Sequence, residues 1–580
     1  MEGNGAESAP KKLTLCSCSQ HALPSYQNIP PPLPESISSN YLPTQKEAHE
    51  THELIEREEQ ILGQYREEMS RVRRLLEVLQ AETKVLEERL SIRRAAVSTI
   101  RKIPVEVLDE IFGIVCHPEN TPHGWQKQSL YIARQTITHP TALAISHTSS
   151  HWRRIMIARP HLWASIFVNI RGLQKDIRPL LSVYLQNSSG APLDLRIVET
   201  TPKRRITIGN STITPFNATR DLGKHGIEAF QLLFGHLSRC GRLEMNVRWE
   251  VLMPDVVGTP DPTIAFPDLH TFTTSEEEWR APWFCEALQE APGLRSLDMH
   301  ILVLPNGAHI LPYQRLTTLS LGYIEGVNLV LQILASCERL ETLDLQEVVP
   351  EPDEVVMAHS LPLPALRKLK LNLSDSDLSA LSGLFASLEM PLLQELSFSS
   401  MDASDPATIS LSLSSFMKML GHSPALRQLT LDIDNTRLPR DSMVELLQLL
   451  PELEQFYLTI FGDMDQDGAI VRLISGLTYT PRLSPPIGSK LTQLKLQEVF
   501  SSADVGIVEV FLNMVESRSR SRLEAVDSSS VTSLCEATLS LTFDDDSPER
   551  FFDPYADPVV EERLEMLQQD GVMCDVACGF

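Results

Sequence analysis

Residues 55–100 carry apolar side chains at alternating steps of three and four positions. Eleven of the fourteen positions on this line are apolar, from Ile55 to Ile100. This spacing places a narrow apolar stripe along a helix, and in water such a stripe must be covered by another helix. We therefore predict a coiled coil over residues 46–102, which could join two copies of the chain as a homodimer. A single long helix packed on the chain's own globular part would show the same stripe.

The segment before this helix has a different composition. Residues 1–45 contain seven Pro and seven Ser and show no apolar period. A segment of this kind cannot bury enough apolar surface to offset the entropy lost on folding. We expect a disordered leader.

A short apolar segment with the sequence IPVEVLDEIF follows the stripe at residues 103–112. Pro104 suits the first turn of a helix, where its missing amide has no partner to lose. Val107, Leu108, Ile111 and Phe112 then share one face at helical spacing. A cluster this short and apolar needs a partner surface, either on another protein or on the repeats that follow it in this chain.

Residues 142–155 form the pattern of a second helix, which runs into the sequence WRRIMIARPHLW at residues 152–163. Together with IPVEVLDEIF, this segment resembles the F-box as it occurs in the large F-box-like families of mushroom-forming fungi. The resemblance covers about residues 55–168. It departs from the family pattern in a longer insertion at 117–141 and in Ser149, which stands where the pattern often has Cys.

The resemblance implies a small three-helix module at residues 103–168 that docks on the Skp-type adaptor of a cullin ubiquitin ligase. The positions that match the adaptor-binding part of the motif are Ile103, Pro104, Val107, Leu108, Ile111 and Phe112. The positions expected in the core of the module are Ile145, Trp152, Ile155, Leu162 and Trp163.

Downstream, the phrase LxxLxL recurs eight times with occasional Phe or Met in place of Leu. Its copies begin at Leu294, Leu316, Leu340, Leu366, Leu393, Leu426, Leu453 and Leu491. The spacing of the earlier copies lies in the range of leucine-rich repeats, and helical runs such as 327–334 and 442–450 separate the phrases. The asparagine or cysteine that usually follows the phrase is missing from every copy, so the repeat is degenerate.

A strand and a helix that cannot bury their apolar faces alone must stack into a solenoid. We therefore predict an α/β fold in which a right-handed leucine-rich-repeat solenoid over residues 251–535 follows the helical parts. Residues 169–250 are expected to connect the module to the solenoid and to cap it, and residues 536–580 to form an acidic tail.

Residues between the inward-facing leucines should point out of the concave side of the solenoid. Lys368 and Lys370 form a basic pair on this face that could hold an acidic degradation signal, although a solvated face without a ligand would have the same pattern. The candidate target-binding residues are Asp298, Asp344, Lys368, Lys370, Tyr457 and Lys495.

Charge separates the parts of the chain. The 580 residues include 51 basic and 76 acidic side chains, a formal net charge of -25. Residues 241–580 alone carry 22 basic and 52 acidic residues, so the repeat region is acidic. Such a surface repels phosphate backbones and anionic lipid, which disfavours general binding to nucleic acid or membranes.

The nine cysteines are few, odd in number and scattered, which suits reduced thiols better than a disulfide framework. No apolar run is long enough for a membrane span, and the first residues do not resemble a signal peptide. We expect a cytoplasmic or nuclear protein.

Motifs that would indicate catalysis or metal binding are incomplete. Residues 463–468 match the first half of a calcium loop, but Ile474 occupies the position of the bidentate Glu. His49 and His52 lack a third ligand, and neither Cys16 with Cys18 nor Cys574 with Cys578 has the spacing of a zinc site. The sequence contains no phosphate loop, nucleophile elbow or zinc-protease motif. We expect no cofactor and no catalytic site.

The order of the parts favours a substrate-recruiting F-box adaptor of a Skp-cullin-F-box ligase, whose helices bind the adaptor subunit and whose repeats bind a protein target. The alternative is a coiled-coil and leucine-rich-repeat scaffold unconnected to ubiquitin. A hydrolase with divergent motifs is a third, less favoured class.

Overall fold

The structure is a computed structural model. The residues it describes are 13–14, 22–23, 44–97, 99–116, 129–133, 136–199, 217–253, 256, 265–275, 282–301, 311–349, 354, 359–372, 382–399, 413–434, 442–461, 469–480, 486–499, 506–525, 531–542 and 557–579. The chain forms two compact units, residues 1–108 and residues 109–580.

The first unit is dominated by one long helix, α1 (Gln45–Val97), as the apolar stripe predicts. A capping box starts it: the Thr44 hydroxyl accepts a hydrogen bond from the Glu47 amide, and the Glu47 carboxylate accepts one from the Thr44 amide at 2.9 Å. Stripe residues such as Leu76 and Leu79 are 53% and 55% exposed. A short turn of 3-10 helix, η4 (Thr99–Lys102), follows α1.

Most of the predicted leader lies outside the described residues. Its described part is one antiparallel strand pair, β1 (Leu13–Thr14) with β2 (Ala22–Leu23).

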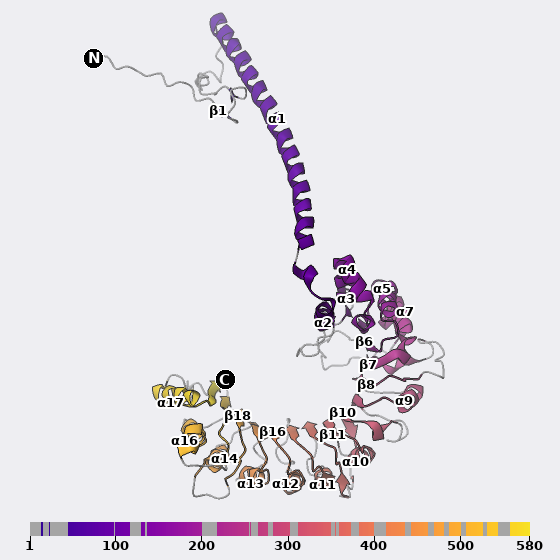
Figure 1. The fold of residues 1–580 in the computed structure, drawn as a ribbon, viewed down its shortest axis with the longest axis vertical. Coiled ribbons are helices and arrows are strands. Elements are labelled where there is room, and N and C mark those ends of the chain that lie inside the picture. The colour runs from indigo at the N-terminus through magenta and orange to yellow at the C-terminus, as the bar shows by residue number, and fades with distance from the viewer. Residues whose placement is uncertain are drawn as a thin grey trace, which may run out of the picture. The chain divides into compact units, whose positions relative to one another are not determined.

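The second unit is built on one long sheet, of which sixteen strands lie in the described residues (Figure 1). Its strands follow chain order, apart from the antiparallel strand β4 at one end, and every other pairing in the sheet is parallel. The first strands are β3 (Leu130–Ala133), β4 (Thr136–His139), β5 (Ser165–Asn169), β6 (Leu193–Val198), β7 (Cys240–Asn246) and β8 (Thr271–Thr274). The others are β9 (Ser296–Ile301), β10 (Thr318–Glu325), β11 (Thr342–Val349), β13 (Lys368–Asn372), β15 (Glu395–Ser399), β16 (Gln428–Asp434), β17 (Gln455–Phe461), β18 (Gln493–Val499), β19 (Glu536–Thr542) and β20 (Met573–Gly579).

The recurring leucine phrase sets the register of the central strands. The second leucine of each phrase pairs with its equivalent on the next strand, in the series Leu297, Leu319, Leu343, Leu369, Leu396, Leu429, Phe456 and Leu494. All eight side chains are 2% exposed or less. The mixed α/β fold with a long parallel sheet is therefore confirmed and is compatible with a repeat solenoid.

Helices connect the strands along the outer side of the curve, and the strands line its inner side (Figure 1). They are α5 (Arg178–Asn187), α6 (Ala218–Asp221), α7 (Gly223–Phe234), α9 (Pro282–Gln289), α10 (Val327–Ala335), α11 (Ser382–Ser387), α12 (Leu413–Gly421), α13 (Ser442–Gln448), α14 (Ala469–Leu477), α15 (Gly506–Ser517), α16 (Arg520–Ala525) and α17 (Pro558–Gln569). A separate short pair joins β12 (Leu361–Pro362), in the connection from β11 to β13, with β14 (Leu388–Glu389), in the connection from β13 to β15.

The sheet extends beyond the predicted repeats at both ends. Strands β5, β6 and β7 precede residue 251, so the segment 169–250 already belongs to the sheet. Strands β19 and β20, with α17 between them, show that residues 536–580 are not only a tail. None of these strands carries the full leucine phrase, which was the main sequence signal for a repeat, and β5 buries all five of its residues instead of alternate ones.

Part of the predicted insertion is also sheet. Within residues 117–141, β3 pairs in parallel with β5 and in antiparallel with β4, while residues 117–128 lie outside the described residues. Among the helices of the described chain, none is both long enough and apolar enough to cross a membrane.

Candidate protein-binding surfaces

Helix α2 (Val105–Cys116) presents apolar residues on two different faces. Leu108, Phe112 and Cys116, at steps of four, are at most 2% exposed. The adjoining face is open to solvent and consists of Val107, Ile111, Ile114 and Val115, with exposed fractions of 47%, 41%, 68% and 43%. We call these four residues the α2 outer face.

The division corrects the predicted adaptor-binding set. Leu108 and Phe112 are buried, so they cannot meet a partner without unfolding of the helix. Ile103 is half-buried, while Pro104, Val107 and Ile111 are exposed. Ile114 and Val115 were missed because the family motif ends before them.

The buried face of α2 packs on the next helical pair. The Phe112 ring meets the Trp152 ring edge to face, with centroids 4.9 Å apart. Asp109 forms an ion pair of 3.0 Å with Arg159. The second predicted helix is in fact two helices, α3 (Thr141–Thr148) and α4 (Ser150–Ile157).

Ser149 causes the break between α3 and α4. Its backbone is extended, and its hydroxyl accepts a hydrogen bond from the Trp152 amide at 3.1 Å, which caps the start of α4. A cysteine at this position, as in the family pattern, would make a weaker cap, so the serine is a local stabiliser.

Trp163 holds the end of this module together. It lies in the 3-10 turn η6 (Pro160–Trp163), is 1% exposed, and donates a hydrogen bond from Nε1 to the Met156 carbonyl at 2.8 Å. Ile155 and Leu162 are also buried, whereas Ile145 and Trp152 are only half-buried. Three of the five predicted core residues are therefore fully inside.

Tyr184 of α5 was not singled out in the sequence, yet it connects the helical module to the sheet. Its hydroxyl accepts a hydrogen bond from the Leu143 amide at 3.1 Å and donates one to the Ser129 carbonyl at 2.9 Å. The rings of Tyr184 and Trp163 pack edge to face, with centroids 5.0 Å apart. Burial raises the pKa of the Tyr184 hydroxyl, so it remains a donor at neutral pH.

The inner side of the sheet carries rows of polar side chains, because alternate residues of each strand point away from the helices. One row contains five of the six candidate target-binding residues, all except Lys368. Its members in order are Asp298, Ser320, Asp344, Lys370, Ser397, Thr430, Tyr457, Lys495, Thr538 and Asp575.

The lysines on this side are paired with carboxylates of neighbouring strands. Lys368 lies 2.8 Å from Glu395, and Lys370 lies 3.5 Å from Asp344. The expected basic pair is therefore already neutralised, which weakens its case as a holder of an acidic signal. The candidate residue Asp298 is half-buried, and burial is the main cause that raises the pKa of its carboxyl.

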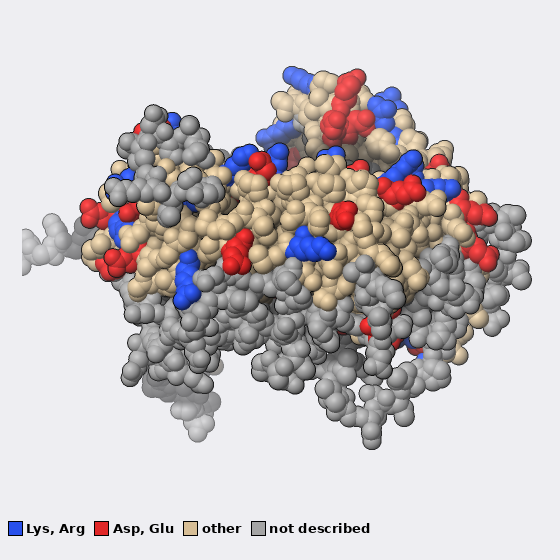
Figure 2. Space-filling view, turned by 90° about the horizontal axis from the view of Figure 1, so that it is seen from below, with Lys and Arg blue, Asp and Glu red and all other residues tan. Residues whose placement is uncertain are grey.

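Tyr457 and Lys495 belong to a further polar group. The Tyr457 hydroxyl donates to the Gln493 side-chain oxygen at 2.6 Å, and the Lys495 ammonium lies 5.3 Å from the centre of the Tyr457 ring. Lys495 also pairs with Glu536 at 2.8 Å, and this hydrogen bond raises the pKa of the lysine. Charged residues on the face seen in Figure 2 likewise form small separate groups of both signs.

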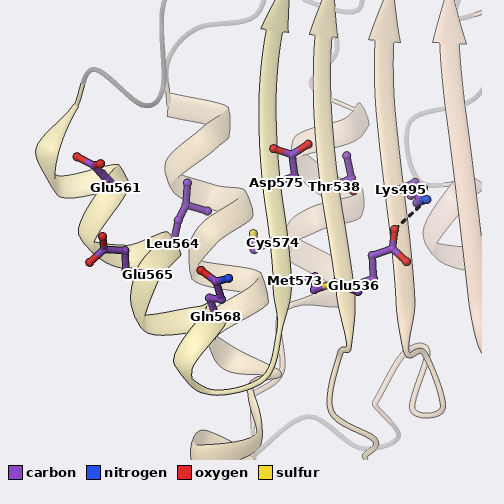
Figure 3. A pocket seen from close by; sticks show the side chains of 10 residues that line it. All are labelled: Lys495, Glu536, Thr538, Glu561, Leu564, Glu565, Gln568, Met573, Cys574 and Asp575. Carbon is purple, nitrogen blue, oxygen red and sulfur yellow. Dashed lines mark ion pairs between the residues drawn. The ribbon is translucent and has the colours of Figure 1, made fainter. Parts of the chain in front are cut away.

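A cavity of about 670 Å³ lies at the C-terminal end of the sheet (Figure 3). It is bounded by α17 and by side chains of β18, β19 and β20. The lining residues are Lys495, Glu536, Thr538, Glu561, Leu564, Glu565, Gln568, Met573, Cys574 and Asp575.

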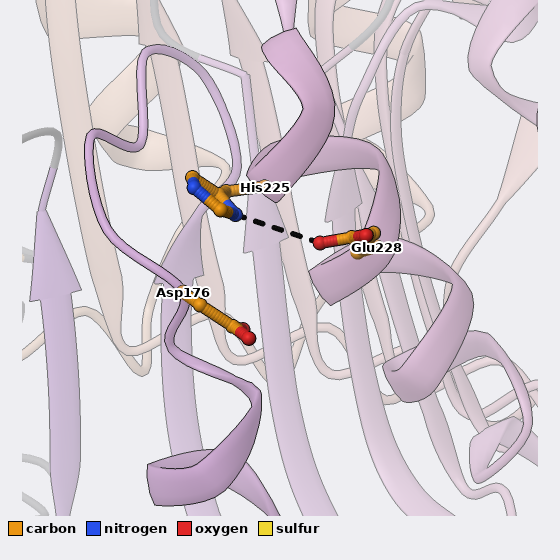
Figure 4. A group of neighbouring side chains, drawn as sticks. All are labelled: Asp176, His225 and Glu228. Atoms are coloured by element: carbon orange, nitrogen blue, oxygen red, sulfur yellow. Dashed lines mark ion pairs between the residues drawn. The ribbon is translucent and has the colours of Figure 1, made fainter.

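Asp176, His225 and Glu228 form a group with metal-ligand chemistry in the described part of the chain (Figure 4). The Arg178 guanidinium lies 2.8 Å from Asp176 and 3.2 Å from Glu228. Hydrogen bonds from Arg178 lower the pKa of Asp176 to about 2. The arginine thus already occupies the position of a cation, and the group is better explained as an ion-pair network that joins α7 to the start of α5.

Of the metal candidates in the sequence, His49, His52 and Cys574 have described side chains. His49 lies on the exposed side of α1 and pairs with Glu53 at 3.4 Å. The half calcium loop at 463–468 and the pair Cys16 and Cys18 lie outside the described residues. Burial raises the pKa of the Cys574 thiol to about 12.

Comparisons with known proteins add little to this geometry. The sequence matches no protein-family model and no curated protein. Among solved structures, the chain is similar to the crystal structure of a protein from Bacteroides fragilis, with 12% identity and a TM-score of 0.26 over 63% of this chain and 86% of that chain.

Proposed function

We propose that the chain is a non-catalytic, substrate-recruiting subunit of a Skp-cullin-F-box ubiquitin ligase. The observation that carries the proposal is the α2 outer face. Four aliphatic residues on three successive turns of one helix are 41–68% exposed. A contiguous apolar face on a helix whose other side is packed is typical of a surface that binds a partner helix or groove.

The position of this helix supports the same reading. α2 belongs to a small helical module with α3 and α4, and all strands of the long sheet except β3 and β4 follow this module in the chain. In the F-box-like families that the sequence resembles, the corresponding helix docks on the Skp-type adaptor. The adaptor would then hold the module, and the sheet would be free to present a target.

For the target, the proposed surface is the inner side of a right-handed leucine-rich-repeat solenoid. Its support is the alignment of equivalent leucines across the strands and the polar rows between them. Rows of mixed hydrogen-bonding side chains with paired charges favour specific recognition over non-specific attraction.

We place the protein in the cytoplasm or the nucleus. Four cysteines of the described chain, Cys116, Cys240, Cys285 and Cys337, are free and buried. Burial raises the pKa of Cys116, Cys240 and Cys337 to about 12, so these thiols are unreactive core residues. Unpaired buried thiols of this kind suit a reducing compartment.

The direct test is a titration of the purified full chain with a Skp-type adaptor, followed by calorimetry. We expect a one-to-one complex. No association of the wild-type chain would reject the ligase role and leave the alternative, an interaction scaffold that uses the same helix and sheet.

The stripe on α1 gives a separate prediction about assembly. If two copies of α1 pair as a coiled coil, light scattering on the full chain will give twice the 65.0 kDa of one chain. The double variant Leu76→Asp with Leu79→Asp should return the mass to that of one chain, because it places carboxylates in the seam.

The control for this experiment is Val78→Asp with Val85→Asp. These side chains are 58% and 41% exposed on the same helix but lie off the stripe. A single-chain mass for the wild type, or an equal loss of mass in both double variants, would contradict pairing through the stripe.

A further inference from the structure

In the described part of the chain, strand β20 is the last strand of the sheet and has one edge without a strand partner. Its other edge pairs with β19. The Met573 amide donates to the Cys535 carbonyl at 2.9 Å, toward the β19 side. Since backbone groups of alternate residues point to opposite sides of a strand, those of Cys574 and Val576 point to the open edge. Such an edge is a template for another extended chain.

The cavity of about 670 Å³ extends from α17 across the last strands of the sheet, β20, β19 and β18 (Figure 3). Leu564 and Gln568 reach it from α17, while Met573, Cys574 and Asp575 reach it from β20. Its volume lies in the usual range of ligand pockets, roughly 300–1,000 Å³. A helix beside an open strand leaves a groove of the shape that an extended peptide fills.

The charge of the groove selects the peptide. Four carboxylates line it, on Glu536, Glu561, Glu565 and Asp575, and Lys495 is the basic residue in the lining. The lysine is paired with Glu536, so the lining carries a net negative charge. Glu561 and Glu565 are exposed on successive turns of α17. Basic side chains would be attracted to this wall, and Leu564 and Met573 would contact their apolar stems.

We propose that the groove between α17 and β20 binds an extended segment of a partner protein with Lys or Arg at alternate positions, which adds to the sheet as a further strand. This deepens the target-binding half of the proposed function and does not depend on the adaptor. A second copy of this chain is a poorer occupant, because pairing of two β20 edges would bring the glutamates of both α17 helices together.

The test uses the full chain and a short fluorescent peptide of alternating Val and Lys, followed by anisotropy. We expect saturable binding, and about tenfold weaker binding by the variant Glu561→Gln with Glu565→Gln. The matched control is Glu286→Gln with Glu290→Gln, an exposed pair with the same spacing at the end of α9. Equal binding by wild type and the Glu561/Glu565 variant would place the peptide elsewhere and overturn the proposal.

Two further peptides test the mode of binding. A peptide with Glu in place of Lys should not bind, and one with Pro at its centre should bind at least about tenfold more weakly, because proline removes a strand donor. Undiminished binding of either peptide would rule out a charge-selected added strand. A different result would identify a second copy of the chain as the occupant. In that case the variant Leu76→Asp with Leu79→Asp would still have twice the mass of one chain, and the Lys peptide would return it to the mass of one chain.

The same Glu561/Glu565 variant is titrated with the Skp-type adaptor. Loss of peptide binding with retained adaptor binding supports the groove. Peptide binding by a chain that fails to bind the adaptor would reject the ligase role alone and leave the groove intact.

Discussion

The variant Ile111→Asp is expected to bind a Skp-type adaptor at least about a hundredfold more weakly than the wild type, with its fold unchanged. Ile111 lies at the middle of the α2 outer face and is 41% exposed in the free chain. In the free protein the new carboxylate would therefore be solvated. In the complex it would be buried among aliphatic side chains without a partner, which costs several kcal/mol, and each 1.4 kcal/mol is a factor of ten.

Calorimetric titration measures this difference, and far-ultraviolet circular dichroism checks the fold. Val471→Asp is the matched control, because Val471 is a 37% exposed aliphatic residue on α14. An unchanged affinity for Ile111→Asp would mean that the α2 outer face is not the adaptor surface, even if the wild-type complex forms.

Leu108 and Phe112 would be misleading choices for the same experiment. Their side chains are 1% and 2% exposed, so a charge at either position would unfold the helix before it met a partner. Loss of adaptor binding in Leu108→Asp would report lost stability and not a lost contact.

The sequence predicts the long helix and the central strands well for a physical reason. Apolar residues at alternating steps of three and four line up on one side only if the segment is a helix. The leucine phrase combines the two-residue period of a strand with a regular repeat length. The outer strands of the sheet could not be found in this way. β19, for example, buries Ala537, Leu539 and Leu541 by alternation alone, which many short segments share.

The buried and exposed apolar faces of α2 could not be distinguished in the sequence, because apolar residues cover more than half of the circumference of this helix. Only the packing of Phe112 on Trp152 decides which side is inside. Pairing of the lysines, in contrast, was within reach. When the phrases at Leu366 and Leu393 are aligned, Lys368 falls beside Glu395, which is the register observed.

Buried ionic groups are the features that the sequence hides most completely. Glu199 is bonded by Arg171 at 3.2 Å and by Arg248 at 2.7 Å, and these residues come from separate connections of the sheet. Arg518 is the second case, since it is 1% exposed and has no carboxylate partner among the described ion pairs. In the sequence it is one of several arginines in the run SRSRSR at 517–522.

Arg518 connects the end of α14 with the segment that precedes β18. Its guanidinium donates hydrogen bonds to the carbonyl oxygens of Leu477 at 2.6 Å, of Gly488 at 2.7 Å, and of Ile487. Burial lowers the pKa of Arg518 to about 10, so the side chain is still charged at neutral pH. The planar fork of an arginine suits several carbonyls at once, whereas a lysine offers a single compact charge.

Arg518→Met should therefore lower the free energy of local opening around residues 486–499 by about 3 kcal/mol. The Gly488 oxygen keeps a hydrogen bond from the Leu491 amide. The carbonyl oxygens of Leu477 and Ile487 lose their hydrogen bonds from the guanidinium, and each loss costs about 1–3 kcal/mol of stability. Removal of a buried charge offsets part of this loss. Hydrogen exchange of peptides from this segment should accelerate about a hundredfold, while the strands β9 and β10 should keep their protection.

The control Arg520→Met, two residues away and paired with Glu524 at the surface, should change exchange by less than about threefold. Equal exchange in both variants would show that the packing of α15, and not the arginine, holds this segment.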